Sequence, residues 1–215
     1  MRAEAHHFLG VLAGSAGHVD EALAEFAAAE KLNPTWADVA FERGRVLESA
    51  GRRDEAIASY QAATQREPNH LPAHFRLSLL LRTQGRAADA EREEKIHRVL
   101  NELFDNSTGR ESKAPERRLE LYGELAALDP ANHAARLEYA RALIELGRKT
   151  EAELALDDLL RDAPAFADTY VVRARLALDG GHREKAAQVI AALAQNVPTA
   201  MASLPESLKS LLPPR

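Results

Sequence analysis

Apolar and polar residues in this chain recur with the spacing of helix faces rather than with the alternation of a strand. The run from Ala37 to Ala50 is helix-like and stops at Gly51, a residue that readily takes the left-handed conformation found at helix ends. A second helix is predicted after it, with four apolar residues at i, i+1, i+4 and i+7: Ala56, Ile57, Tyr60 and Ala63. The pattern predicts two helices joined by a tight turn.

Several columns of residues recur along the chain with one step of 34 positions. Prolines keep this step, apart from an interval of 62 after the second of them: Pro34, Pro68, Pro130, Pro164 and Pro198. Glycines and alanines keep it too: Gly17, Gly51, Gly85, Gly147 and Gly181, then Ala22, Ala56, Ala90, Ala152 and Ala186. So do a bulky and a small column: Phe26, Tyr60, Leu156 and Ile190, then Gly10, Gly44, Ser78, Ala140 and Ala174. Independent columns that share one period predict structural repeats.

Each repeat is predicted to be a helix–turn–helix hairpin. In the second repeat, Asp54 and Glu55 fall in the first turn of the second helix, where carboxylates complement the helix dipole. Pro68 ends that helix, and the small Gly44 allows its two helices to approach closely. Such a hairpin cannot bury its apolar face alone, so it must stack on its neighbours. The sequence therefore predicts an all-α solenoid of antiparallel helix hairpins.

We expect one domain that covers the whole chain, residues 1–215. Its predicted units are residues 3–36, 37–70, 71–104, an irregular unit at 105–132, 133–166 and 167–200. A short C-terminal helix at residues 203–212 is predicted to cap the last repeat with Leu204, Leu208, Leu211 and Leu212. The alternative is a tail that binds in the groove of another copy.

These residues resemble the tetratricopeptide repeat (TPR) family. Its pattern has an aromatic, then Leu-Gly, then an aromatic, and later Ala, a bulky aromatic and Pro. In the first repeat the matching residues are Leu9, Gly10, Ala22, Phe26, Ala29 and Pro34. The second and last repeats match it with Gly44, Ala56, Tyr60, Ala63 and Pro68, and with Tyr170, Ala174, Ala186 and Pro198. The leading Trp of the pattern is missing, since the lone Trp36 falls in a turn. The resemblance covers residues 3–100 and 115–198 and implies a right-handed superhelix.

The middle of the chain breaks the repeat. The second helix of the third repeat continues without a Pro to about Phe104, and a helix-like segment starts again at Pro115. Two packings are open: an extended helix in the third repeat, which we favour, or a shortened first helix at residues 99–104. In both, residues 105–114 are expected to be the most mobile internal segment, because they are rich in turn formers and charge.

The composition excludes several classes of function. The net charge of −5 is spread along the chain without a basic block, which argues against nucleic acid as a partner. No apolar run is long enough for direct membrane insertion, and the N-terminus is a poor signal peptide. We expect a bacterial, cytoplasmic protein, or a periplasmic one if a signal has been removed. There is no cysteine, which excludes disulfides and thiol catalysis.

No catalytic residue, cofactor or metal site is predicted. The chain lacks the motifs of phosphate-binding loops, dinucleotide folds, zinc proteases and nucleophile elbows. His70 and His74 have the spacing of a helical metal pair, but His70 stands before Leu71 and Pro72, outside the expected helix. The chain is thus not expected to be an enzyme.

The resemblance implies a concave groove lined by the first helix of each hairpin, where a protein or peptide partner binds. At i, i+4, i+7 the groove stripe reads His7, Val11, Gly14; Phe41, Arg45, Glu48; Phe75, Leu79, Arg82; Leu137, Arg141, Ile144; and Val171, Arg175, Leu178. We expect the partner-binding residues to be Phe41, Arg45, Phe75, Arg76, Leu79, Arg82, Leu137, Arg141, Val171 and Arg175. Arginine beside apolar surface suits an acidic segment. The alternative is that Arg45 and Arg141 pair with the glutamates three positions before them.

The function predicted from these observations is a non-catalytic protein–protein interaction scaffold. One alternative is a regulatory or targeting TPR region of a larger enzyme or assembly. The other is a scaffold that assembles with copies of itself into a homo-oligomer. A receptor for chaperone C-termini is not expected, because of the five positions that would form the family's carboxylate clamp only Arg76 fits.

Overall fold

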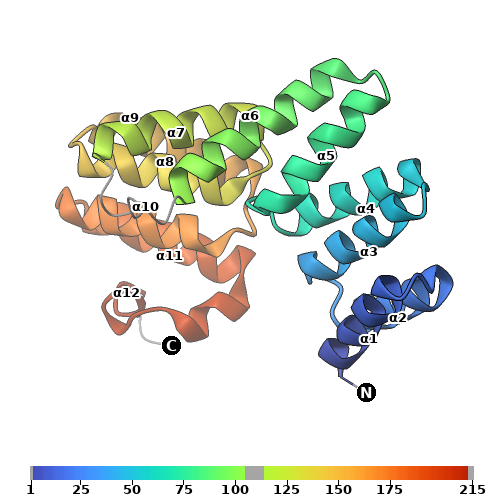
Figure 1. Ribbon diagram of the computed structural model, residues 1–215. Coiled ribbons are helices and arrows are strands. Elements are labelled where there is room, and N and C mark those ends of the chain that lie inside the picture. Colours follow the sequence, from blue (N-terminus) through green and yellow to red (C-terminus); the bar gives the residue numbers. More distant parts are fainter. Residues whose placement is uncertain (1, 105–113, 213–215) are drawn as a thin grey trace. The chain divides into compact units, whose positions relative to one another are not determined.

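The computed structural model describes residues 2–104 and 114–212, and it is helical without strands over these ranges. The predicted all-α, TPR-like fold of helix hairpins is thereby confirmed, whereas the handedness of its superhelix stays a prediction. The chain divides into two compact units, Met1–Phe104 and Asp105–Arg215, which are described separately (Figure 1). The prediction that they form one domain stays a prediction.

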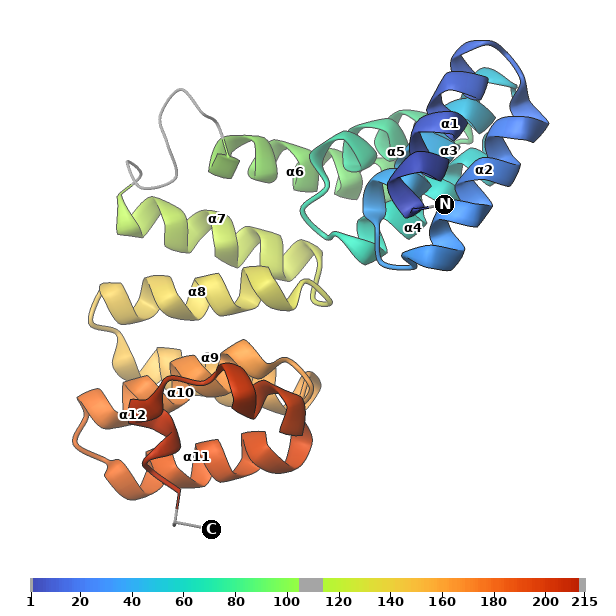
Figure 2. The same cartoon turned by 90° about the horizontal axis from the view of Figure 1, so that it is seen from below.

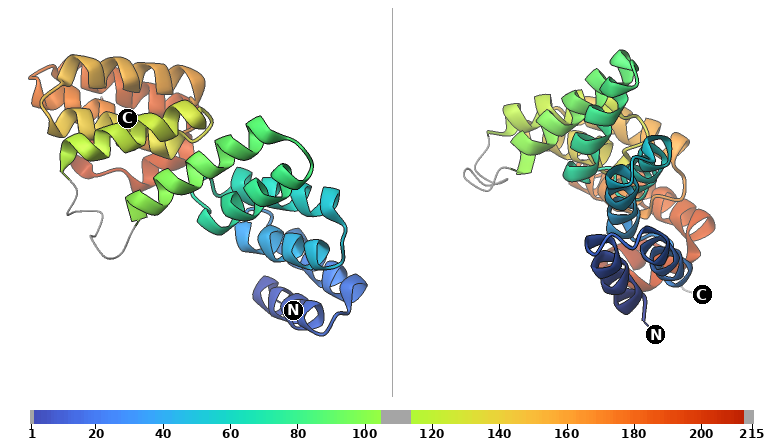
Figure 3. Two further views of the ribbon diagram at one scale, coloured as in Figure 1. Left: turned by 45° about the horizontal axis from the view of Figure 1, so that its top comes forward. Right: turned by 45° about the vertical axis from the view of Figure 1, so that its right-hand side comes forward.

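Unit one consists of three hairpins that follow one another along the chain. Their helices are α1 (Ala3–Ser15), α2 (Val19–Leu32), α3 (Ala37–Ser49), α4 (Arg53–Arg66), α5 (Leu71–Thr83) and α6 (Ala87–Phe104). Each odd-numbered helix packs on the even-numbered helix after it, and α2 and α4 pack on the first helix of the next hairpin (Figure 3). Antiparallel helix hairpins are therefore present, as the fold class predicted.

Unit two continues the same alternation. Its elements are α7 (Pro115–Leu128), α8 (His133–Glu145), α9 (Lys149–Asp162), α10 (Ala167–Asp179), α11 (Arg183–Asn196), the 3-10 helix η2 (Pro198–Ser203) and α12 (Glu206–Lys209). Here α7 lies beside α8, and η2 and α12 contact α11 (Figure 2). Thus α7 packs as a second helix would, without a first helix of its own among the described residues.

Glycine forms the turn between the two helices of each complete hairpin. Five glycines have positive φ values between 73° and 81°: Gly17, Gly51, Gly85, Gly147 and Gly181. A side chain at this backbone conformation is strained, because a Cβ atom crowds the following carbonyl. The glycine column of the sequence therefore marks the hairpin turns, as predicted.

Where the repeat is broken in the middle of the chain, the second helix of the third hairpin is extended, which is the favoured of the two predicted packings. Helix α6 has 18 residues against 14 in α2 and in α4, and it runs to Phe104 without interruption. The alternative of a separate short helix at residues 99–104 is therefore wrong. The expectation of mobility for residues 105–114 falls on 105–113, which lie outside the described residues.

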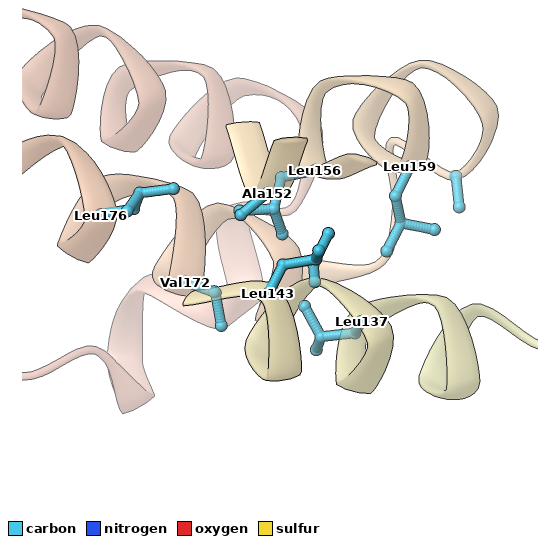
Figure 4. Close-up of a cluster of buried hydrophobic side chains, with 9 residues drawn as sticks. Leu137, Leu143, Ala152, Leu156, Leu159, Val172 and Leu176 are labelled. Carbon is cyan, nitrogen blue, oxygen red and sulfur yellow. The ribbon is translucent and has the colours of Figure 1, made fainter. Parts of the chain in front are cut away.

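Each unit has its own apolar core between the helices. In unit two, Leu137 and Leu143 of α8 meet Leu156 and Leu159 of α9, with Val172 of α10 beside them (Figure 4). In the last hairpin, Leu204 and Leu208 are buried in a cluster with residues of α10 and α11, against which Leu211 and Leu212 also pack. The four leucines of the predicted cap thus lie together; that they serve to cap the solenoid stays a prediction.

No helix within the described ranges combines the length and the apolar character that a bilayer-spanning segment requires.

Candidate functional site

A pocket of about 500 Å³ crosses the first helices of all three hairpins of unit one. Its lining comes from α1, α3 and α5: Val11, Gly14, Ser15, Glu42, Arg45, Val46, Glu48, Ser49 and Arg76. The lining repeats with the step of the chain, since Ser49 follows Ser15 by 34 positions and Arg76 follows Glu42 by 34. Equivalent positions of successive repeats therefore build one continuous surface.

The floor of this pocket lies at a close contact between α1 and α3. A Cβ atom added to Gly14 would overlap Cγ2 of Val46, so only glycine allows this approach. Val46 is 8% exposed and packs in the core with Ala22 and Phe26 of the first hairpin. The pocket thus has an apolar floor that belongs to the rigid core.

The rim of the pocket carries two arginines that are paired with two glutamates. One guanidinium nitrogen of Arg45 donates to both carboxylate oxygens of Glu42, at 3.1 and 3.0 Å. Arg76 of α5 lies 3.6 Å from Glu48 of α3. The two charge signs are therefore balanced around the pocket, and both guanidinium groups are about half exposed.

Glu48 also accepts a hydrogen bond from a buried tyrosine. The hydroxyl of Tyr60 donates to Glu48 at 2.6 Å, and the Tyr60 ring is fully buried. Burial, and next the hydrogen bond to the Glu48 carboxylate, raise the pKa of Tyr60 well above its ordinary value. Tyr60 therefore stays a donor that fixes the position of Glu48, and Glu48 in turn positions Arg76.

The groove residues predicted in unit one lie in different surroundings. Arg45 and Arg76 line the pocket described above, whereas Phe41 lines a neighbouring pocket. Phe75 and Leu79 have exposed side chains on α5, and the Phe75 ring lies 5.3 Å from the His97 ring of α6.

All three predicted arginines of unit one have acidic partners within the chain, and the partner of Arg76 is Glu48. Arg82 forms an ion pair with Glu94 of α6. The alternative interpretation of Arg45, a pair with the glutamate three positions before it, describes its contact correctly.

The groove residues predicted in unit two also differ from one another. Leu137 is only 3% exposed and belongs to the core of α8, α9 and α10, against which Leu119 of α7 packs, so the expectation that it lies on an exposed stripe is wrong. Arg141 is exposed and its Nε lies 3.7 Å from Glu138. Val171 is half-buried, and Arg175 is exposed without an ion pair to any described residue.

Several pocket residues are missing from the predicted set. Val11, Gly14 and Glu48 stand in the predicted stripe, but Ser15, Glu42, Val46 and Ser49 do not. Ser15 and Ser49 share one repeat position at the end of a first helix, and this 34-residue step is the signal that could have found them. Val46 could not be found in this way, because its apolar side chain indicates a core position. The sequence does not show that part of this side chain also lines a pocket.

The histidine pair with metal spacing is used for other contacts. His70 caps α5, where its Nδ1 accepts a hydrogen bond from the backbone N–H of Ala73 at 3.1 Å. His74 lies 2.6 Å from Glu93 through Nδ1 and 2.9 Å from the carbonyl oxygen of Pro68 through Nε2. Over the described parts of the chain, no group of three or more His, Cys, Asp or Glu is placed to hold a metal ion.

Comparison with known proteins identifies the repeats. Sequence models of the tetratricopeptide repeat match residues 9–69, 41–95 and 110–170. No curated protein matches the chain.

Three solved structures are among those similar to this chain. A thermophilic TPR protein from Thermus thermophilus shares 20% identity over 97% of this chain and 98% of that one, with a TM-score of 0.44. A tetratricopeptide repeat protein from Parabacteroides merdae shares 16% over 98% and 82%, with a TM-score of 0.41. PilF from Pseudomonas aeruginosa shares 18% over 91% and 92%, with a TM-score of 0.42. At such identities none of them tells what this chain binds.

Proposed function

Because the chain belongs to the tetratricopeptide repeat family, whose members are protein-interaction scaffolds, we propose that it binds a peptide or protein segment along the first helices of its hairpins. We propose a non-catalytic role, as is general for this family. A cytoplasmic location is part of the proposal.

The observation that carries this proposal is the pocket across α1, α3 and α5. At about 500 Å³ it has room for two or three side chains of a bound segment. It combines an apolar floor at Val11 and Val46 with charged groups at its rim. A few polar groups around an apolar hollow are the usual composition of a site that fixes a ligand's orientation.

An acidic segment is the proposed partner of Arg45 and Arg76. Both side chains are about half exposed, and a carboxylate of the partner would compete for their donors with Glu42 and Glu48. Bidentate hydrogen bonds between guanidinium and carboxylate groups would give such a contact its direction. Arg141 and Arg175 of unit two are the proposed continuation of this arginine series.

Selection from a random peptide library displayed on phage tests the proposal with the full chain as bait. Ser49→Trp fills the pocket from the exposed end of α3, so selected peptides should bind this variant at least about tenfold more weakly than the wild type. Ala27→Trp, at an exposed position of α2 outside the pocket lining, is the matched control and should bind like the wild type. Equal binding to Ser49→Trp and the wild type would refute the pocket as the site.

Charge reversal tests the acidic part of the proposal separately. Arg45→Glu with Arg76→Glu should weaken peptides rich in Asp and Glu, whereas Arg52→Glu, from the exposed pair with Glu55, should not. Arg141→Glu with Arg175→Glu shows whether unit two takes part. Circular dichroism must confirm unchanged helicity, and selected peptides without Asp or Glu would contradict an acidic partner.

Self-assembly is a second candidate function, favoured by one apolar face of α1. Leu12 is 67% exposed, whereas its equivalents Val46, Leu80 and Leu176 are 8%, 6% and 4% exposed. Those equivalents are buried because the preceding hairpin packs on them, and the described residues offer nothing in that place for Leu12. Sedimentation velocity should show self-association that Leu12→Glu removes and that Leu154→Glu, at the exposed Leu154 of α9, leaves unchanged.

A further inference from the structure

A second pocket in unit one exists because α6 is longer than the other second helices. The position in α6 that corresponds to the last residue of α4, Arg66, is Leu100, so residues 101–104 form an additional turn. Asn101 and Phe104 of this turn line a pocket of about 530 Å³, together with residues of α3, of the connection from α4 to α5 and of the start of α5. The departure from the repeat thus builds a hollow that a regular third repeat would lack.

The lining of this pocket is acidic. It contains the carboxylates of Asp38, Glu42 and Glu67, and no Lys or Arg is among its described lining residues. The one histidine in the lining is His70, whose Nδ1 accepts from the N–H of Ala73 and whose Nε2 therefore donates to Asp38, at 3.3 Å. His70 in this form is neutral, so it does not offset the negative charge.

The three carboxylates differ in their hydrogen-bond and ion-pair partners. Glu42 is held by Arg45, and Asp38 accepts from the indole N–H of Trp36 at 3.1 Å. Glu67 is exposed and forms no ion pair with any described residue. A positive group that enters the pocket would therefore find at least one carboxylate whose charge is not already compensated.

Apolar groups complete the pocket. Phe41 and Phe104 contribute aromatic rings from α3 and from the additional turn, and Pro72 contributes a further apolar surface. The Phe41 ring is fixed by the His70 ring, 4.9 Å from it, while Phe104 is 39% exposed. Aromatic faces beside carboxylates attract a cation and also cover the alkyl stem of a long basic side chain.

We propose that this pocket takes the side chain of a lysine or arginine of the bound protein segment. The alkyl stem would lie against Phe41 and Phe104, and the charged end would reach Glu67 and Asp38. This inference rests on the proposed function, because Glu42 lines both pockets and one segment can occupy both. The segment would then carry an acidic residue for the first pocket and a basic residue for the second.

Titration of the isotope-labelled full chain with N-acetyl-arginine amide (arginine amide for short) tests the inference by two-dimensional NMR. Arginine amide and N-acetyl-lysine amide should shift the amide signals of Phe41, Glu67 and Phe104 in a saturable way. N-acetyl-glutamine amide, which has no charge, should cause at least about fivefold smaller shifts at the same concentration. Equal shifts with the glutamine compound, or a preference for N-acetyl-glutamate amide, would overturn the proposal.

Substitutions of the lining residues test whether arginine amide binds in this pocket. Asp38→Asn with Glu67→Gln should raise the apparent Kd for arginine amide at least about fivefold, and Phe104→Ala should raise it as well. Asp168→Asn with Glu184→Gln removes two exposed carboxylates from unit two and is the control of equal charge change. Unchanged binding in the Asp38 and Glu67 variant would also overturn the proposal.

The outcome is separable from that of the peptide experiment. Ser49→Trp fills the first pocket only, so arginine amide should still bind it with the wild-type Kd. Loss of peptide binding in Ser49→Trp without any response to arginine amide would leave the proposed function intact and reject the basic subsite. The reverse result would support the subsite and reject the first pocket as the peptide site.

Discussion

The bare Cα of Gly44 faces the ring of Tyr60 so closely that a Cβ atom there would lie 2.6 Å from Cε1. Gly10 and Phe26 have the same relationship one repeat earlier, also at 2.6 Å. In both hairpins the first helix packs directly on an aromatic ring of the second helix. The contact holds Tyr60 where its hydroxyl reaches Glu48 at the rim of the first pocket.

Gly44→Ala should destabilise the protein by about 2 kcal/mol, although alanine favours the helix, because the new methyl group overlaps the fully buried ring of Tyr60. Urea unfolding followed by circular dichroism measures this loss. In a Tyr60→Leu background the same substitution should cost much less. An equal cost in both backgrounds would show that the ring is not the cause.

Stability should depend on pH through Tyr60. Its pKa is raised in the folded protein, mainly by burial, so above the ordinary tyrosine pKa of about 10 the unfolded chain loses a proton that the folded chain keeps. This contribution is fully present below about pH 10 and falls by about 1.4 kcal/mol for each pH unit above it. Tyr60→Phe lacks this dependence.

Urea unfolding of the wild type and Tyr60→Phe from about pH 9 to about pH 11.5 isolates this effect from that of the other tyrosines. The stability difference between the two proteins should shrink as the pH rises. A difference that stays constant over this range would show that Tyr60 ionises equally well in the folded protein.

Glu93→Gln should destabilise the protein more than Glu25→Gln. The pairs His74–Glu93 and His6–Glu25 occupy the same repeat positions at the same distance of 2.6 Å, but the first pair is 3% and 11% exposed and the second 17% and 26%. Removal of a charged acceptor costs more where water cannot replace it, so we expect about 2 kcal/mol for Glu93→Gln and less than about 1 for Glu25→Gln. Equal losses in urea unfolding would contradict this dependence on burial.

The adjacent glycines at the last hairpin turn should respond differently to alanine. Gly181 has a φ of 76°, whereas Gly180 has a φ of −88° that any residue adopts. Gly181→Ala should therefore cost about 1 kcal/mol. Gly180→Ala should be close to neutral, since the nearest side-chain atom, in the exposed His182, can move. Thermal unfolding of both variants compares them, and similar losses would refute the left-handed turn.

The hairpins could be predicted from the sequence because their signals are local. A glycine such as Gly51 ends a helix through its own backbone, and a proline such as Pro68 stops the next one, without help from the rest of the chain. The small Gly44 opposite Tyr60 could be read from the repeat for the same reason. These features alone determined the all-α class, the helix pairing and the positions of the turns.

The candidate site could be predicted only in part. Arg45 was found because the repeat fixes its helix and helical spacing fixes its face, and Arg76 was found because it stands next to the stripe residue Phe75. The prediction that Leu137 is exposed was wrong. Leu137 occupies the same repeat position as Phe41, but in unit two it packs into the core of α8, α9 and α10. Exposure of a side chain depends on what its neighbours cover, and a repeat position does not encode that.

The sequence by itself thus determined the period, the helix ends and the kind of fold, since these follow from backbone preferences that act over a few residues. Only the tertiary structure decided that Arg45 and Arg76 share a pocket with Glu42 and Glu48, and that the last turn of α6 brings Phe104 near Phe41. These pockets join residues that are far apart in the chain. Their formation depends on how closely whole helices pack, which the side chains of several repeats set together.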